Sequence, residues 1–243
     1  MCTVTFIPSG GKFFLTANRD EQKTRQAALP PEIGQLNGRR ILFPRDAHAG
    51  GTWFAINEDG TAVVFLNGAK EKHVHRPPYR KSRGLVLLDL VSSPSPVMAF
   101  EQADLDQIEP FTAIITECSR LFTCCWNGCS KSTERLNERQ AHIWSSFTLY
   151  DPATVEKRQQ WFDSWISQNP GPSPGKIRHF HQFAGDGDPH HDLKMNRNNK
   201  IFTHSISSAC ISQNAVTLHY LDLRRMESTE RSLRFLKTVP VIA

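Results

Sequence analysis

Four pairs of strand-like runs, each pair joined by a short turn, constrain the fold of this chain more than any other feature. The runs are rich in β-branched and aromatic residues, which favour strands, and several of the turns contain Gly, Asp or Asn. Runs that follow each other this closely pair as antiparallel hairpins. The predicted pairs are 3–7 with 12–17, 52–57 with 61–67, 111–117 with 121–127, and 201–211 with 215–223.

Three segments between these pairs have the apolar spacing and start signals of amphipathic helices. Two have proline or serine at a boundary, and the third has an aspartate as N-cap followed by proline in its first turn. The predicted helices are 80–93, 95–103, and one after Asp151 with Val155, Phe162, Trp165 and Ile166 on its apolar face.

The order of these elements predicts an α+β fold with antiparallel sheets, because strands pair locally and helices come between the pairs. Two sheets with helices outside would cover every apolar face. Residues 169–176 are predicted to be a loop, and residues 179–192 a polar, turn-rich segment. Too little chain follows to build a second core, so we expect a single domain over residues 1–243.

Composition excludes several classes of protein. No apolar run approaches the roughly 18 residues that cross a bilayer. The N-terminus has no basic segment followed by an apolar one, which is unlike a signal peptide, so we expect a cytoplasmic protein. The net charge is +5, but the densest basic segment, 70–83, contains only Tyr79 as an aromatic residue. We therefore expect no nucleic-acid partner, although this loop could attract an anionic ligand or lipid headgroup.

The six cysteines indicate neither a disulfide framework nor a zinc site, because no C-x-x-C spacing occurs. Five of them are expected to be buried thiols that act as small apolar residues. The exception is Cys2. Removal of Met1 would give this residue both a thiol and a free α-amine, whose pKa is ordinarily near 7.7–8.0. The thiolate is a nucleophile, and the amine can serve as its base.

The first hairpin predicts charged partners for Cys2. If residues 12–17 run back antiparallel to residues 3–7, then Asn18, Arg19 and Asp20 come out next to residue 2. Neighbouring strand residues face opposite sides, so Arg19 and Asp20 need not point the same way. The alternative is that Arg19 and Asp20 form an ordinary surface ion pair, which would contribute little.

The sequence also resembles a known family. The runs "MCTVTF", "LTANRDE", "GGTWFAINEDGTAVVFLNG" and "SSFTLYDPATVEKRQQWF" are similar to the NRDE family, also called the transport and Golgi organisation protein 2 family, from residue 2 to about 223. The resemblance implies an N-terminal-nucleophile hydrolase fold, a four-layer αββα sandwich. It also implies that Cys2 is the catalytic nucleophile and that Asp20 orients its amine, with Arg19 and Asn18 in the same motif.

One position departs from related hydrolases. In the choloylglycine and penicillin V acylase branch an arginine lies three residues before the aspartate, whereas this chain has Ala17 there. For substrate binding in an oxyanion hole, the candidates are Asn67 and Asn127, each at the end of a predicted strand and followed by glycine. An asparagine that caps a turn before glycine is the alternative for both.

Two functions fit this reading. The first is a cysteine amidohydrolase that cleaves a C–N bond of a small acyl substrate. The second is a non-catalytic intracellular protein that binds or carries haem or an acyl lipid, since the family is associated with haem trafficking and lipid metabolism. Haem is thus a possible ligand, and no other cofactor and no metal are expected. The candidate haem ligands are His73, His75, His179 and His181.

Overall fold

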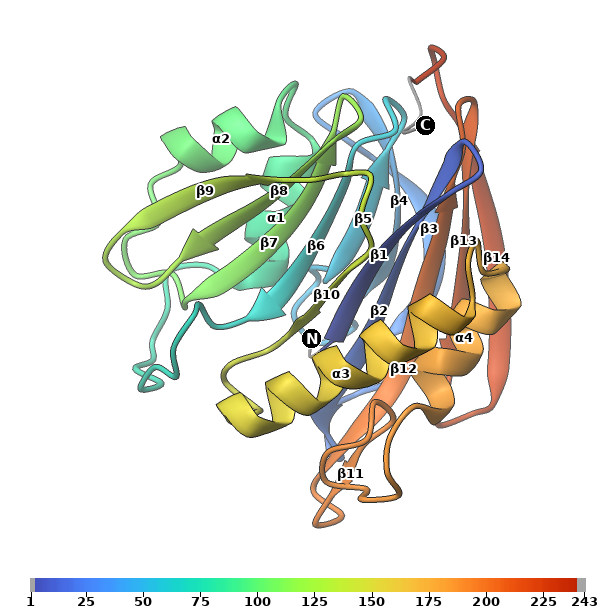
Figure 1. Cartoon of the computed structure of the whole chain (residues 1–243). Helices are drawn as coiled ribbons and strands as arrows, with labels where there is room; N and C mark the ends of the chain where they lie inside the picture. The colour runs from blue at the N-terminus through green and yellow to red at the C-terminus, as the bar shows by residue number, and fades with distance from the viewer. Residues whose placement is uncertain (1–2, 240–243) are drawn as a thin grey trace.

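The first hairpin lies in the middle of an antiparallel sheet. The computed structural model describes residues 3–239. Within these residues the first sheet has seven strands, with β1 and β2 flanked by β10 on one side and β12 on the other (Figure 1). In spatial order they are β10 (His142–Ser145), β1 (Thr3–Ser9), β2 (Lys12–Gln22), β12 (Ile201–Ile211), β13 (Ala215–Asp222) and β14 (Glu227–Arg234), with β11 (Asn196–Arg197) beside β12.

The second sheet is also antiparallel and seven-stranded, and its strands follow one another in chain order. Each strand pairs with the next through a short connection or, between β6 and β7, through two helices. The strands are β3 (Leu29–Leu36), β4 (Arg39–Arg45), β5 (Phe54–Asn57), β6 (Ala62–Asn67), β7 (Phe111–Glu117), β8 (Arg120–Trp126) and β9 (Lys131–Leu136).

The helices cover the outer faces of the two sheets, so the layers run helix, sheet, sheet, helix (Figure 1). Helices α1 (Arg83–Val91) and α2 (Pro96–Gln102) pack on the second sheet, and α3 (Pro152–Gln168) and α4 (Pro174–Phe183) pack on the first. Ser82, Ser95, Asp151 and Ser173 cap them at the N-terminus. The predicted α+β, four-layer αββα architecture is confirmed.

Strand alternation divides the apolar residues into three layers. In β2, Phe13, Leu15 and Ala17 face the second sheet and form the central core with Phe54 and Val64. The residues between them face the other way, toward α3 and α4. Separate apolar clusters lie under α1 and α2 and under α3 and α4.

Several elements differ from the sequence predictions. Strand β2 continues to Gln22, because β12 pairs with it up to that residue. Helix α4 begins at Pro174, where a loop and then a turn-rich segment were predicted. This helix buries only Ile177, Phe180 and His181, so its apolar face is too narrow to be recognised from the sequence.

The thiols are also more varied than predicted. Cys124 and Cys125 are buried and Cys210 is half-buried, but Cys118 and Cys129 are exposed. Cys118 lies in the turn between β7 and β8, and Cys129 lies in the turn between β8 and β9. Both turns are at the surface, so neither thiol is buried in an apolar cluster. In residues 3–239, no helix has the length and apolar character needed to cross a bilayer.

Gly51 and Gly84, which lie in close contact, allow α1 to begin against the second sheet. The Thr52 N–H donates to the Gly84 carbonyl at 3.2 Å, and a Cβ on Gly84 would lie 2.9 Å from the backbone nitrogen and oxygen of Thr52. A Cβ at that distance must displace backbone, because there is no flexible side-chain end to move.

We therefore expect Gly84→Ala to lower the free energy of unfolding by about 1–3 kcal/mol, as overpacking does. Urea unfolding followed by circular dichroism measures the change. Gly175→Ala is the matched control, because the nearest atom to a Cβ there is Ser173 Oγ at 3.9 Å. Equal unfolding midpoints for the two variants would contradict the close approach at Gly84.

Candidate active site between the two sheets

Residues 18–20 lie inside β2, and the strand alternation sends their side chains to opposite faces. Thr3, the first described residue of β1, pairs with Asn18. Cys2 lies outside the described residues. Arg19 continues the inward series of Leu15 and Ala17, toward the second sheet, whereas Asn18 and Asp20 face the helix layer. The structure therefore brings these three sequence-predicted residues to one end of β1 but divides them between two environments.

Arg19 is anchored on the inner face by a carboxylate and an aromatic ring. Its Nη2 donates to Asp46 at 2.7 Å, and its guanidinium lies 4.7 Å from the centre of the Trp53 ring. Arg19 is only 4% exposed. Its Nη1 and the Trp53 Nε1 are buried and have no hydrogen-bond partner among residues 3–239. Two adjacent donors thus remain unsatisfied, which is costly unless a ligand supplies an acceptor.

Asp46 is ionised beside these cations. Burial by itself raises the pKa of the Asp46 carboxyl, but the Ala49 backbone N–H and the guanidinium groups of Arg19 and Arg25 outweigh it, so the pKa lies below its ordinary value of 3.8. Arg25 contacts the same carboxylate at 3.0 Å. One carboxylate therefore orients two arginines on the wall of the interior.

A cavity of about 530 Å³ opens beside Arg19 and Trp53. Phe65 and Asn67 from β6 line it, as does Arg83, whose guanidinium is 3.0 Å from Glu109. The volume falls within the range of small-molecule sites.

The cavity lies next to the N-terminal end of β1. The Asn67 carbonyl accepts a hydrogen bond from Ser146 Oγ at 2.6 Å, and the preceding residue, Ser145, pairs with Thr3. Asn67 and Arg19 thus lie on either side of the point where the chain enters β1.

Asp20 is held on the opposite face of β2. The Tyr150 hydroxyl donates to its Oδ2 at 2.6 Å, and the Thr203 hydroxyl donates to its Oδ1 at 2.5 Å. Tyr150 also contacts the Met195 sulfur at 3.0 Å. The carboxylate is only 2% exposed, and these two donors fix its orientation at the end of the β1–β2 pairing.

Arg158 of α3 supports this arrangement from the helix layer. It is fully buried, and its guanidinium lies 3.7 Å from the centre of the Tyr150 ring. Its Nη1 donates to Thr3 Oγ1 at 2.5 Å, and its other donors bond to the backbone carbonyls of His191 and Asp192 at 2.7–3.0 Å. This side chain therefore links β1 to the chain segment that precedes β11.

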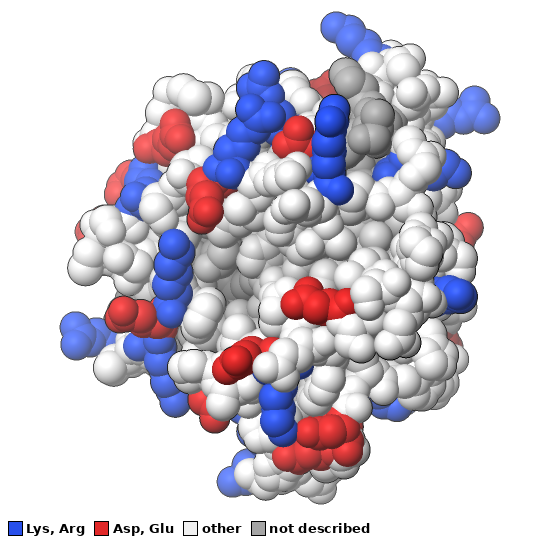
Figure 2. All heavy atoms as spheres, viewed as in Figure 1, with Lys and Arg blue, Asp and Glu red and all other residues white. Residues whose placement is uncertain are grey.

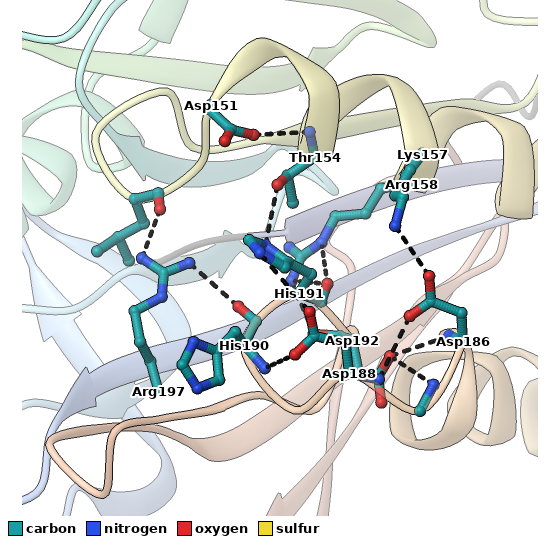
Figure 3. A network of polar contacts seen from close by, with 12 residues as sticks. Asp151, Thr154, Lys157, Arg158, Asp186, Asp188, His190, His191, Asp192 and Arg197 are labelled. Atoms are coloured by element: carbon teal, nitrogen blue, oxygen red, sulfur yellow. Dashed lines mark hydrogen bonds and ion pairs between the residues drawn. The ribbon is translucent and has the colours of Figure 1, made fainter.

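That segment folds against the N-terminal half of α3 through several polar contacts (Figure 3). Lys157 pairs with Asp186 at 2.9 Å, and Thr154 Oγ1 lies 2.9 Å from His191 Nδ1. Arg197 donates to the Leu149 carbonyl at 2.6 Å and to the His190 carbonyl at 3.1 Å. These contacts hold in place the backbone carbonyls of His191 and Asp192, to which Arg158 donates.

Asn18 makes a separate buried cluster with α4. Its amide nitrogen donates to the carbonyls of His181 and Leu193, at 3.0 and 2.7 Å, and its oxygen lies 2.7 Å from His181 Nδ1. His181 Nε2 lies 2.8 Å from Thr5 Oγ1. Burial, and then the charge of Arg158, lower the pKa of His181 from 6.5 to about 3. This histidine is neutral at neutral pH and ties α4 to the first hairpin.

The remaining sequence-predicted residues are divided between the cavity and other parts of the molecule. Asn127 is not among the residues that line the interior cavity, and its Oδ1 accepts from the backbone of Cys129 and Ser130, as a turn cap does. His75 lines the cavity and lies 3.3 Å from Glu109, and His73 lies 3.4 Å from the same carboxylate. His179 is exposed, apart from the buried His181. Residues 3–239 contain no group of three or more His, Cys, Asp or Glu that could hold a metal ion.

The sequence analysis missed five polar or aromatic residues at the site. They are separated from β2 in the chain, although Trp53, Tyr150 and Arg158 lie in runs that carried the family resemblance. A buried arginine in the second turn of an amphipathic helix gives no sequence signal of its own. The missed residues are Asp46, Trp53, Tyr150, Arg158 and Thr203.

Three comparisons place the chain among known proteins. The profile of the family described as Transport and Golgi organisation 2 matches residues 1–225. A comparison with curated protein sequences found no match. Among solved structures, similar chains include two variants of the conjugated bile acid hydrolase from Clostridium perfringens and an N-acylethanolamine-hydrolyzing acid amidase orthologue from Caenorhabditis elegans.

The structural likeness extends over nearly whole chains at low sequence identity. The two hydrolase variants give a TM-score of 0.61 with 12% and 11% identity, covering 100% of this chain and 98% and 99% of theirs. The amidase gives 0.57 with 12% identity, covering 85% of this chain and 92% of its own. At this identity the likeness establishes the N-terminal-nucleophile hydrolase fold.

His181 predicts a pH dependence of stability. Its folded pKa is below its unfolded pKa, so the unfolded chain binds the extra proton between pH 6.5 and about 3, and stability falls as the pH is lowered through that window. We expect His181→Gln to remove this contribution, which makes the decline shallower by about 1.4 kcal/mol per pH unit.

Chemical unfolding at pH values from 7 to 4 measures this slope. His179→Gln is the control, because it removes an exposed imidazole from the same helix. Identical slopes for wild type and His181→Gln would contradict a buried neutral imidazole.

Proposed function

Because the chain belongs to the Transport and Golgi organisation 2 family and has an N-terminal-nucleophile hydrolase fold, we propose that it is a cysteine amidohydrolase that cleaves a C–N bond of a small acyl substrate. The observation that carries the proposal is the position of Asp20. Its buried carboxylate, held by Tyr150 and Thr203, lies at the end of the strand pairing that begins at Thr3, next to Cys2 in the sequence.

The proposed reaction begins after removal of Met1. The Cys2 sulfur attacks the amide carbonyl carbon, and the thiol proton passes to the α-amine of the same residue. That amine then protonates the leaving nitrogen as the C–N bond breaks, which leaves a thioester on Cys2. Water, deprotonated by the amine, attacks the thioester and releases the carboxylic acid. Asp20 orients the amine through both steps.

The activities for which the structural neighbours are named support this class of reaction. One is called a conjugated bile acid hydrolase, and one of its two variants has alanine in place of a cysteine at its second residue. The other is called an amidase that hydrolyses N-acylethanolamines. Both names describe hydrolysis of an acyl compound, and this chain also has cysteine as its second residue.

The inner cavity is the proposed substrate site. Arg19 Nη1 and Trp53 Nε1 are buried donors that no described residue accepts from, so we assign them to an acceptor oxygen on the substrate. Asn67, at the rim nearest β1, is the proposed second polar contact. Arg19 thus has a binding role, since its side chain faces the cavity and not the side of Asp20. Asn127 keeps its role as a turn cap.

The first test combines intact-mass measurement with amide hydrolysis. We expect protein that begins at Cys2 to release a fluorescent amine from short N-acyl aminocoumarin amides, and Cys2→Ala to abolish that release. Asp20→Asn should lower kcat about 10²–10⁴-fold, as loss of a general acid–base arrangement does. Cys129→Ala is the control, because it removes an exposed thiol.

Retention of Met1 in the active protein, or full activity in Cys2→Ala, would contradict the mechanism. Tight binding of an acyl lipid or of haem by protein that cleaves no amide would favour the binding and trafficking alternative.

A second test separates substrate binding from chemistry. Trp53→Phe keeps the ring that stacks on Arg19 but removes the Nε1 donor, so we expect KM to rise about 5–10-fold with little change in kcat. Arg19→Lys keeps a cation beside Asp46 but loses the second guanidinium donor, and should act in the same direction. A fall in kcat at constant KM in both variants would show that these side chains act in the chemical step.

A further inference from the structure

A second hollow lies at the N-terminal end of β12, and it shares no lining residue with the interior cavity. Its volume is about 360 Å³. It is bounded by the start of β12, the segment that leads into β11, and the end of β13. We call it the β12 hollow.

The rim of the β12 hollow is cationic. Lys23, Lys194 and Arg224 line it, and none of them forms an ion pair within residues 3–239. Arg224 Nη1 donates to the Arg25 carbonyl at 2.9 Å, and Lys23 Nζ lies 3.3 Å from Asn199 Oδ1. The ammonium of Lys194 has no hydrogen-bond partner in the described chain. On the face that Figure 2 shows, basic and acidic side chains are intermixed.

The floor of the β12 hollow is apolar. Met195 is only 2% exposed, and Phe202 and Leu223 are half-buried. Lys23 Nζ lies 5.7 Å from the centre of the Phe202 ring, so the aromatic face and the cation border the same space. An apolar floor below a ring of cations matches a molecule with an apolar body and an anionic head.

His204 is the polar group inside this hollow. It is 4% exposed and lies at an irregularity in the β2–β12 pairing, between Thr203 and Ser205. Its Nδ1 is buried and has no hydrogen-bond partner in the part of the chain that the structure describes. Burial, followed by the charges of Arg19 and Arg224, lowers its pKa to about 4, so the ring is neutral at pH 7. In the Nδ1–H tautomer it has a donor that nothing in residues 3–239 accepts.

We propose that the β12 hollow binds a compact amphiphile with one anionic head, of which an arylalkyl carboxylate is the simplest example. The head lies among Lys23, Lys194 and Arg224 and accepts from His204 Nδ1, while the body covers Met195 and Phe202. A desolvated anion needs these cations and the donor, and the apolar body supplies the contact area that a small ion lacks.

This ligand would contact residues that hold the Asp20 carboxylate in place. Thr203, which lines the hollow, donates to the Asp20 carboxylate, and Met195, which also lines it, contacts the hydroxyl of Tyr150, a second donor to that carboxylate. The β12 hollow and the interior cavity are thus on either side of the same short stretch of β2. The binding itself needs no hydrolysis, so the proposal stands independently of the proposed reaction.

Titration of the full chain with 4-phenylbutyrate at pH 7 tests the site, with calorimetry for affinity and ¹⁵N NMR for location. We expect shifts at the amides of residues 194–204 and 223–224. Lys194→Glu and Lys194→Met should each weaken binding at least tenfold. Lys237→Glu, an equal charge change at an exposed lysine outside the hollow, should leave it within twofold. Cys2→Ala should bind as wild type does.

Two further ligands test the chemistry. The neutral 4-phenylbutanamide should bind at least tenfold more weakly than the carboxylate, and inorganic phosphate should also be weaker because it has no apolar body. The proposal is overturned if Lys194→Glu retains wild-type affinity, or if the shifts appear at the Trp53 indole and not around residues 194–204. Equal binding of phosphate or of the amide would overturn it as well. Lys194 is exposed, so its variants report binding without a risk to folding.

Discussion

The antiparallel pairing of β2 with β12 is the interaction on which the rest of the site depends. It extends from Gln22 opposite Ile201 to Phe13 opposite Ile211, and strand alternation along this length gives the two faces of β2 different environments. On the inner face it presents Arg19 to the cavity, and on the outer face it presents Asp20 to Tyr150 and Thr203. Thr203 comes from β12 itself, so the same pairing positions the carboxylate and its partner.

Charge is distributed differently on the two faces of this strand. On the inner face, Arg19 is balanced by Asp46, and its Nη1 has no acceptor among residues 3–239. On the outer face, the buried Arg158 faces backbone carbonyls and the Tyr150 ring. Carbonyl dipoles solvate that cation, and Tyr150 bridges it to Asp20. The Asp20 carboxylate is therefore oriented by the neutral hydroxyls of Tyr150 and Thr203, while the Arg19 cation lies on the cavity side of β2.

Much of the fold could be predicted because local pairing dominates it. The hairpin at residues 3–17 and the three later ones were recognisable from apolar runs and turns. The sequence analysis did not predict β3, β4, β9, β10, β11 or β14. Strands β9 and β14 were missed because KSTERL and ESTERSLR are almost wholly polar, as edge strands are. The motif at residues 18–20 was visible, but Tyr150 and Thr203, which hold Asp20, and Arg158, which contacts Tyr150 and Thr3, were not. They lie more than 100 residues away in the chain, and only tertiary packing brings them to the first hairpin.

The pairing of an early strand with a late one has a consequence for biosynthesis. While the ribosome is still translating residue 195, β2 has β1 beside it but no β12, and Asp20 has no Thr203. Contacts of such high sequence separation form late in folding, after the local hairpins. A nascent polypeptide therefore cannot complete this carboxylate environment, and the centre matures only when the final quarter of the chain has been delivered and docked.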